Sequence, residues 1–396
     1  MRLLHSLYSH AAFHRSKENI MAYQDQRTRL KALLAAIAAA LTFVFLLSLL
    51  VPTAQAEPED DYTIICPPDG DGSELLINVY IDAANDNAGR DTIVISPTGN
   101  VCAFNLVSAA GDYGSGGVGL PLITDDLVIR ALGPGAVFQR DASTTERFRI
   151  LESDAPLTLE NVTIQNGHTS NPRRGGGIYA RNPLTLTNVV ITGNQSYGGG
   201  GLYAAAGLVM DGVVVSNNET SSGNPSHGGG FWVDGDLHAR AITVTGNTAY
   251  DCGCGGDRAR GGGAYVGGSA DIDDALFLQN ESTGNDGGGL YVDGPLTLSN
   301  SAFYSNTAGS TGGGAAAESL TLSNSTFGHN QAEYGGGLLI TSGSANTVSG
   351  ATFERNVAIQ EGGGLLSSNA VLIDNSRFLD NEAFAAAGAL RCHPPE

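Results

Sequence analysis

A glycine triplet recurs through the second half of the chain, and it restricts the fold more than any other feature. The last glycine of each triplet stands at Gly177, Gly201, Gly230, Gly263, Gly289, Gly314, Gly337 and Gly364, with Gly388 in a degraded ninth copy. The intervals between these glycines run from 23 to 33 residues. Periods of this size are typical of proteins built from stacked structural repeats.

Between the triplets the apolar residues alternate with polar ones, as in "GGGIYARNPLTLTNVVITGN" (175–194). Alternation predicts β-strands rather than helices. Near the end of each repeat an apolar residue stands three positions before an asparagine. The apolar residues are Ile191, Val215, Val244, Phe277, Phe303, Phe327, Phe353 and Phe378, and the asparagines are Asn194, Asn218, Asn247, Asn280, Asn306, Asn330, Asn356 and Asn381. Short strands joined by tight corners predict an all-β chain, a right-handed parallel β-helix of about nine regular turns.

The glycines and asparagines have a structural interpretation. A corner between strands often needs a positive φ, which glycine tolerates, and glycine also avoids crowding where identical corners stack. Asparagine tolerates left-handed conformations and can bond both the backbone and the asparagine of the next turn. We therefore interpret the asparagine series as structural rather than ligand-binding.

The repeat resembles the glycine-triplet and F-x-x-N repeats of polymorphic outer-membrane proteins and related bacterial surface β-helices of the pectin-lyase-like superfamily. "DGSELLINVYIDAANDNAGRDTIVI" is similar to the N-terminal cap of CSLREA-type β-helix proteins, although "LLIN" replaces the expected "LREA". The resemblance covers nearly all of residues 60–391. It implies the fold and says little about activity, because such folds carry many functions.

A short helix is expected to cover the first turn of the β-helix. Ser73 can cap a helix that runs through about Asn85. Its expected apolar face consists of Leu76, Val79, Tyr80, Ala83 and Ala84. This cap and irregular turns make up residues 57–150, and regular repeats make up 151–396. No comparable cap follows the last strand, where a partner, a missing domain or a truncated gene are the alternatives.

The first 56 residues have the pattern of an export signal. Three basic residues precede an apolar run from Ala32 to Val51, and "AQA" (54–56) offers the small residues that signal peptidase accepts. The run is also long enough to span a bilayer, so an uncleaved anchor is the alternative. Met21 is a possible true start. We expect a bacterial protein that is secreted or held at the cell surface.

The charge of the chain excludes one class of partner. Asp and Glu number 40 against 20 Lys and Arg, which gives a net charge of −20. Nucleic acids and anionic membranes require a cationic face, so neither is an expected partner. The only expected membrane contact is the possible N-terminal anchor.

Five cysteines fit an exported protein and leave at least one thiol unpaired. We favour a disulfide between Cys66 and Cys102, worth about 3–4 kcal/mol in the loop-entropy model. Cys252 and Cys254 lack a second ligand pair for zinc, so no metal site is predicted. The pairing of Cys252, Cys254 and Cys392 stays open.

The middle residue after the triplet is aromatic in five successive copies: Tyr179, Tyr203, Trp232, Tyr265 and Tyr291. If the residues on either side face inward, these rings form an outer strip roughly 20 Å long. Such a strip would suit sugar rings or a partner strand. In the opposite register the rings are simply core, and the sequence leaves both interpretations open.

Two adjacent repeats place charged residues at outward positions where most repeats have Thr or Ser. They are His238 and Arg240 in "LHARA" and Asp271 and Asp273 in "DIDDA", and parallel register sets His238 beside Asp271 and Arg240 beside Asp273. The two longest repeat intervals converge here, and the longer one carries Asp257, Arg258 and Arg260. The four residues are either a catalytic patch beside a binding loop or two surface ion pairs of little energetic worth.

The rest of the sequence contains few catalytic motifs. The resemblance implies that a polysaccharide lyase of this fold would use Lys or Arg as its base, together with calcium held by carboxylates. No lysine follows residue 56. "GHTS" at Gly167 is a corner with a histidine, and "GNDGGGLYV" (284–292) is a single poor match to calcium-binding nonapeptides. No cofactor is predicted, and calcium is the weak exception.

We therefore predict a non-enzymatic, adhesin-like β-helix that binds a glycan or a surface protein. The alternatives are a polysaccharide lyase or glycoside hydrolase of the pectin-lyase-like superfamily and a module of a larger surface protein. The oligomeric state is left open.

Overall fold

The computed structural model describes residues 61–86, 88–114, 116–170, 172–221, 226–251, 253, 259–343, 345–385 and 388–392. The chain divides into two units, residues 1–56 and 57–396, and the described residues all belong to the second. The predicted signal segment and the possible start at Met21 therefore lie outside the described residues. So do Cys252, Cys254, Asp257 and Arg258.

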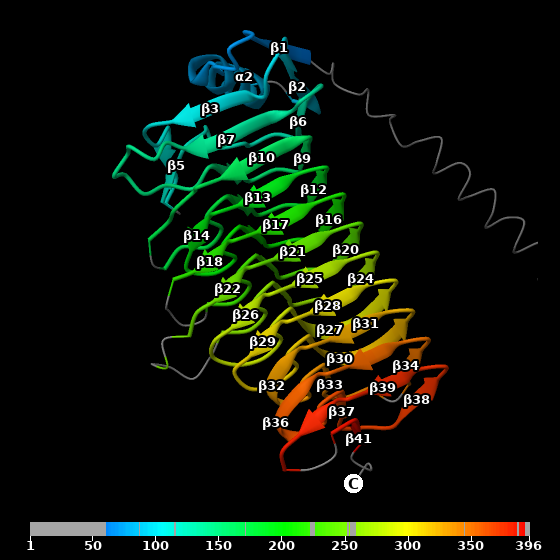
Figure 1. Ribbon diagram of the computed structural model, residues 1–396. Coiled ribbons are helices and arrows are strands. Elements are labelled where there is room, and N and C mark those ends of the chain that lie inside the picture. Colours follow the sequence, from blue (N-terminus) through cyan, green and yellow to red (C-terminus); the bar gives the residue numbers. More distant parts are fainter. Residues whose placement is uncertain are drawn as a thin grey trace, which may run out of the picture. The chain divides into compact units, whose positions relative to one another are not determined.

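Successive turns of the chain stack in parallel, as Figure 1 shows from β1 and α2 at one end to β38 and β41 at the other. The first sheet of this stack has 20 strands among the described residues. They are β1 (Asp61–Cys66), β2 (Asp91–Pro97), β6 (Leu127–Ala131), β8 (Leu151–Ser153), β9 (Leu157–Glu160), β11 (Ile178–Ala180), β12 (Leu184–Thr187), β15 (Leu202–Ala204), β16 (Leu208–Asp211), β19 (Phe231–Val233), β20 (Leu237–Arg240), β23 (Ala264–Val266), β24 (Ala270–Asp273), β27 (Leu290–Ser299), β30 (Ala315–Ser323), β33 (Leu338–Ile340), β34 (Asn346–Ser349), β37 (Leu365–Ser367), β38 (Val371–Asp374) and β41 (Leu390–Cys392).

The second sheet gains one strand in each turn and has 11 within the described ranges. They are β3 (Cys102–Leu106), β7 (Ala136–Arg140), β10 (Val162–Gln165), β13 (Val190–Thr192), β17 (Val214–Ser216), β21 (Thr243–Thr245), β25 (Leu276–Leu278), β28 (Ala302–Tyr304), β31 (Thr326–Gly328), β35 (Thr352–Glu354) and β39 (Arg377–Leu379). Its inward phenylalanines stack from turn to turn, and the rings of Phe303 and Phe327 lie 4.8 Å apart. Both side chains are fully buried, as alternation predicted.

The third sheet closes each regular turn, and the part of the chain that the structure describes holds eight of its strands. They are β14 (Gln195–Ser196), β18 (Glu219–Thr220), β22 (Thr248–Ala249), β26 (Glu281–Ser282), β29 (Thr307–Ala308), β32 (Gln331–Tyr334), β36 (Val357–Glu361) and β40 (Glu382–Ala383). A small antiparallel pair, β4 (Gly111–Asp112) and β5 (Gly117–Val118), lies among the irregular early turns. One side of every turn faces a common apolar core.

The glycine triplet satisfies two different requirements of the corner. Gly175 has a φ of 67°, a conformation that side chains resist. Gly176 and Gly177 have ordinary φ values, but a Cβ on either would lie 2.5 Å and 2.7 Å from the carbonyl oxygens of Gly200 and Gly201 in the next turn. Backbone strain explains the first glycine, and crowding between layers explains the other two.

The asparagine series forms a buried hydrogen-bonded ladder. The Asn194 side-chain Nδ2 donates to the backbone oxygen of Ile164 at 3.1 Å and to Asn218 Oδ1 at 3.0 Å. The pattern repeats to Asn381. The left-handed conformation predicted for these asparagines is wrong, because the residue before each one adopts it instead: Gly193 has a φ of 63° and Asn217 a φ of 53°. The ladder side chain thus points inward, where its amide satisfies buried backbone groups.

Helix α2 (Glu74–Asp86) packs on β1, β2 and β3, and the Ser73 hydroxyl accepts a hydrogen bond from the Leu76 N–H. Of the apolar face predicted for it, only Tyr80 and Ala84 pack in or against the core. Leu76 and Val79 are 40% and 49% exposed, whereas Ile77 and Ile81 are buried together with the predicted Ala84. Because the helix is apolar on most sides, several stripes with helical spacing compete, and the sequence does not select among them.

The cysteines favoured as a pair form a disulfide. Cys66 ends β1 and Cys102 begins β3, both are buried, and their Cα atoms are 5.8 Å apart. Cys392 on β41 is a free, exposed thiol. No described helix has the length and apolar character needed to span a bilayer.

Candidate functional site

The five aromatic residues form one column on the outer side of the first sheet. Tyr203 pairs with Tyr179 on one side and with Trp232 on the other, and the series continues through Tyr265 to Tyr291. Centroids of neighbouring rings lie 5.0–5.8 Å apart. The flanking residues face the common core, while the rings form a cluster of their own. The rings therefore lie on the side of the strands opposite the main core, where they form a second buried cluster of their own.

The exposure predicted for this aromatic column is wrong for its three central rings. Tyr203, Trp232 and Tyr265 are 4%, 5% and 8% exposed. The Arg174 guanidinium lies 3.8 Å from the Trp232 ring centroid, and His227 stacks on Tyr265 at 4.6 Å. A ring covered in this way cannot stack on a sugar in this conformation.

Two further covering residues come from the long repeat intervals, whereas Arg174 precedes the first triplet. His227 and Arg260 immediately precede the triplets that end at Gly230 and Gly263. Arg260 lies over the Tyr291 ring at 5.1 Å. The described ends of these two insertions thus lie over the aromatic column.

Two aspartates bind the polar ends of the aromatic column. Trp232 Nε1 donates to Asp234 Oδ1 at 2.7 Å, the Tyr203 hydroxyl donates to Asp234, and the Tyr265 hydroxyl donates to Asp293. Burial, and then the bonded carboxylates, raise the pKa of Tyr203 and Tyr265 above the ordinary value. Tyr203, Trp232 and Tyr265 are therefore held both at the ring face and at the polar edge.

The same column begins with a buried ion network that the sequence did not reveal. Glu152 pairs with Tyr179 across the strands and lies 2.7 Å from Arg149, and both charged side chains are fully buried. Arg181 reaches Glu152 at 2.8 Å. Burial lowers the pKa of Arg149 to about 10, so the guanidinium keeps its charge at neutral pH. The carboxylate of Glu152, bound by two arginines, thus lies next to the first ring of the aromatic column.

The four charged candidates lie together on open strands. His238 pairs with Asp271 and Arg240 with Asp273, as the predicted register requires. They line a shallow hollow of about 350 Å³. His238 Nδ1 and Asp271 Oδ2 are 3.9 Å apart, and both side chains are about two-thirds exposed. The patch is therefore open to solvent.

The surroundings of Asp273 do not suit a general acid. Ser299 Oγ and Asn300 Nδ2 each donate to its Oδ1 at 2.7 Å, and these bonds hold the pKa of Asp273 below its ordinary value. The carboxylate is consequently ionised at neutral pH. Within the described ranges, no group of three or more His, Cys, Asp or Glu side chains is arranged to hold a metal ion.

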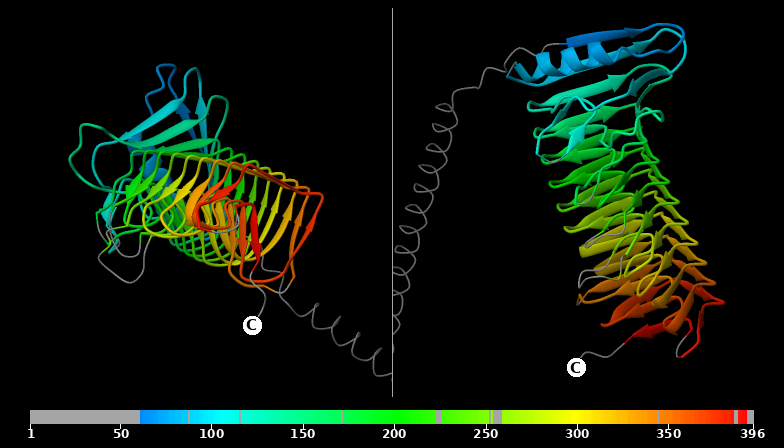
Figure 2. Two further views of the ribbon diagram at one scale, coloured as in Figure 1. Left: turned by 60° about the horizontal axis from the view of Figure 1, so that its bottom comes forward. Right: turned by 90° about the vertical axis from the view of Figure 1, so that its left-hand side faces the viewer.

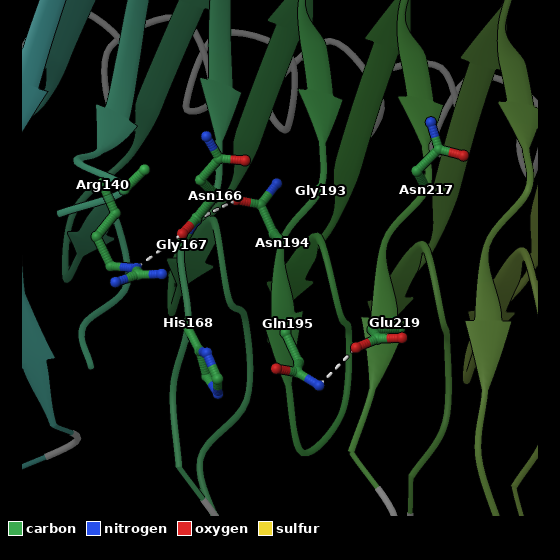
Figure 3. A pocket seen from close by; sticks show the side chains of 10 residues that line it. Arg140, Asn166, Gly167, His168, Gly193, Asn194, Gln195, Asn217 and Glu219 are labelled. Atoms are coloured by element: carbon green, nitrogen blue, oxygen red, sulfur yellow. Dashed lines mark hydrogen bonds between the residues drawn. The ribbon is translucent and has the colours of Figure 1, made fainter. Parts of the chain in front are cut away.

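A second hollow was not predicted, and Figure 3 shows it at the corner between the second and third sheets. It has a volume of about 390 Å³. We call it the polar hollow. Its polar lining residues are Arg140, Asn166, His168, Asn194, Gln195, Asn217 and Glu219. They come from four successive turns, and most of them follow strands of the second sheet.

The polar hollow offers both donors and acceptors. Gln195 Nε2 donates to Glu219 Oε1 at 2.6 Å, and Arg140 Nε donates to the Asn166 carbonyl at 3.0 Å. Burial, and then the charges of Arg147 and Arg140, hold the pKa of His168 below its ordinary value. A neutral imidazole donates from one nitrogen and accepts at the other.

The sequence contained a signal for this site. Gln195 and Glu219 each follow a ladder asparagine, and that position faces outward because the asparagine faces inward. His168 lies one turn earlier and pairs with Gln195. The histidine of the "GHTS" corner thus begins a polar row that continues into the next two turns.

The comparison with known proteins agrees with this architecture. A family model described as a right-handed β-helix region matches residues 135–303. Neither a curated protein nor a solved structure matches the chain. The match and the stacked parallel sheets together confirm the predicted right-handed parallel β-helix.

Proposed function

We propose that this chain is an exported, non-enzymatic β-helix protein that binds a neutral glycan in the polar hollow. The observation that carries the proposal is the row of His168, Gln195 and Glu219 along one open corner, with Arg140 at its end. Such a row presents hydrogen-bonding groups about every 4.8 Å along the axis. A sugar chain laid along the corner would meet one such group per turn.

A neutral sugar suits the chemistry of this row best. Sugar hydroxyls both donate and accept, and so do the amide of Gln195 and the neutral imidazole of His168. The carboxyl group of Glu219 adds further acceptor oxygens. The net charge of −20 repels polyanionic polymers, whereas a neutral chain meets no such barrier.

Export and a place at the bacterial surface belong to the same proposal. They rest on the basic and apolar N-terminal pattern and on the resemblance of the repeat to surface β-helices. A surface protein is the other partner that an adhesin-like molecule would bind, and it would use the same open corner.

One observation favours the alternative of a polysaccharide lyase or glycoside hydrolase. His238, Arg240, Asp271 and Asp273 do gather in one hollow. The low pKa of Asp273 and the open setting of the other groups weigh against it, because catalytic acids are usually buried to raise their pKa. We expect no unsaturated sugars from pectate or alginate, and their release, if abolished by Asp273→Asn, would establish the enzyme instead.

A glycan array probed with the purified protein tests the binding proposal. We expect binding to neutral glycans, and Gln195→Ala should weaken it about two- to tenfold, the value of one hydrogen bond. The matched control is Gln331→Ala, because Gln331 occupies the same outward column five turns away. Equal binding by both variants would remove the polar hollow from the proposal, and binding only to acidic glycans would contradict a neutral ligand.

A further inference from the structure

The single tryptophan of the chain shares one carboxylate with a neighbouring tyrosine. Trp232 Nε1 donates to Asp234 Oδ1 at 2.7 Å, and the Tyr203 hydroxyl donates to the other oxygen of the same carboxylate. The two rings belong to adjacent turns, and successive turns stack in register, as both views of Figure 2 show. One carboxylate therefore accepts the two protons that an indole and a phenol lose when each is oxidised by one electron.

The packing of these two rings suits an electron transfer inside the protein. The ring centroids of Tyr203 and Trp232 lie 5.7 Å apart, and the two residues are 4% and 5% exposed. Rings in contact exchange an electron directly, and burial keeps dissolved reductants away from them. A radical formed on one ring consequently meets the other ring before it meets any solute.

Arg174 favours the radical on the tyrosine. Its guanidinium lies 3.8 Å from the Trp232 ring centroid and 4.9 Å from that of Tyr203. A positive charge opposes the loss of an electron more strongly from the nearer ring. Arg174 Nη1 also donates to the Tyr203 hydroxyl at 3.0 Å, so the phenoxyl oxygen left after proton loss keeps a buried hydrogen bond.

Tyr265, on the opposite side of the tryptophan, provides the contrast. Its ring centroid lies 5.3 Å from that of Trp232, slightly closer than Tyr203, and the residue is 8% exposed. Its hydroxyl, however, donates to Asp293 and not to Asp234. Proximity alone therefore favours Tyr265, whereas a proton path through one carboxylate favours Tyr203.

We propose that the aromatic column passes an oxidising equivalent from Trp232 to Tyr203 through the carboxylate of Asp234. A one-electron oxidant, such as an oxygen-centred radical, removes an electron from the indole of Trp232, and the Nε1 proton moves to Asp234 Oδ1. An electron then passes from Tyr203 to the indole. The phenol proton moves to Asp234 Oδ2 while the proton on Oδ1 returns to Nε1. In total one hydrogen atom leaves Tyr203, and the tryptophan is restored.

Laser flash photolysis of the purified protein tests this transfer. Light that indole absorbs and phenol does not ejects an electron from Trp232, and dissolved hexaamminecobalt(III) takes up that electron. We expect the absorption of the indole radical to decay while that of a tyrosine phenoxyl radical rises at the same rate, independent of protein concentration. Decay without a phenoxyl signal, or a rate that increases with protein concentration, would overturn the proposal.

Three conservative variants locate the path. Tyr203→Phe keeps the ring but removes the phenol, and it should abolish the phenoxyl signal. Tyr265→Phe is the matched control, because it changes the closer ring, and it should leave the rate unchanged. Asp234→Asn removes the proton acceptor and should slow the transfer about 100-fold, the lower value for loss of a positioned base.

Circular dichroism verifies that each variant keeps the fold. A phenoxyl signal that is lost in Tyr265→Phe and kept in Tyr203→Phe would show that proximity directs the radical, and it would contradict the path through Asp234. An unchanged rate in Asp234→Asn would contradict that path as well.

Discussion

Two columns of outward-facing side chains on the first sheet differ in their exposure to solvent. The column from Glu152 through the aromatic residues to Leu366 is almost closed to solvent: Trp232 is 5% exposed and Leu366 is 7% exposed. The column on the other strand of each turn is open, and it contains His238, Asp271 and Thr297. Both columns obey the same alternation, so the strand pattern alone does not distinguish them.

Loops cause the difference. The covered column follows the triplets, where the chain arrives from the variable part of each repeat, and Arg174, His227 and Arg260 reach over it. The open column lies between two tight corners that leave no residues to cover it. Whether an outward side chain is exposed is thus decided by the length and course of the loops, and not by the register of the strand.

The covered column should be the more sensitive of the two to truncation. Trp232→Ala removes a ring that packs on Tyr203, Tyr265, His227 and Arg174, and we expect a loss of about 3–5 kcal/mol in the free energy of unfolding. Urea unfolding followed by circular dichroism measures this loss.

Leu339→Ala, further along the same column, provides the comparison. Its smaller side chain should cost about 2–3 kcal/mol. A loss below about 0.5 kcal/mol for Trp232→Ala would mean that the loops do not close over the rings in solution.

The sequence was sufficient for the fold because each glycine and asparagine has a role fixed within its own repeat. Gly176 and Gly177 must be glycine wherever another turn stacks on them, and Asn194 must reach its counterpart Asn218. The period therefore identifies the architecture directly.

The site was harder to predict, because its features depend on contacts between turns and loops. The burial of Trp232 depends on Arg174 and His227, which stand 58 and five residues before it. Both stand just before a glycine triplet, at a position whose residue type differs from turn to turn. The partners Arg149 and Glu152 lie outside the repeat pattern altogether. No local rule of alternation anticipates such contacts.

Alkaline pH should weaken the covered column before the rest of the molecule. An unfolded tyrosine ionises near pH 10, and the pKa values of Tyr203 and Tyr265 are higher when folded. As the pH rises above 10, the unfolded state loses protons that the folded state retains, so the free energy of unfolding falls. Below pH 10 this contribution is fully present.

The single tryptophan makes this effect measurable. Trp232 lies between the two tyrosines, so its fluorescence reports unfolding of the covered column, while circular dichroism reports all turns. Between pH 9 and pH 11 the urea midpoint should fall more by fluorescence than by circular dichroism. A double variant, Tyr203→Phe and Tyr265→Phe, should remove the excess shift. An equal shift in that variant would assign the effect to other groups.

The open column should give the smallest effect. Thr297 is exposed on β27, where it pairs with Asp271 on one side and Thr321 on the other. Thr297→Ala should therefore change the free energy of unfolding by no more than about 0.5 kcal/mol, since it leaves no cavity and no buried polar group. Phe303→Ala in the same turn is the reference, because that buried ring lies between Phe277 and Phe327 and should cost about 3–5 kcal/mol. If Thr297→Ala cost as much as Phe303→Ala, the second column would also be covered in solution, and loop length would no longer explain why the two columns differ.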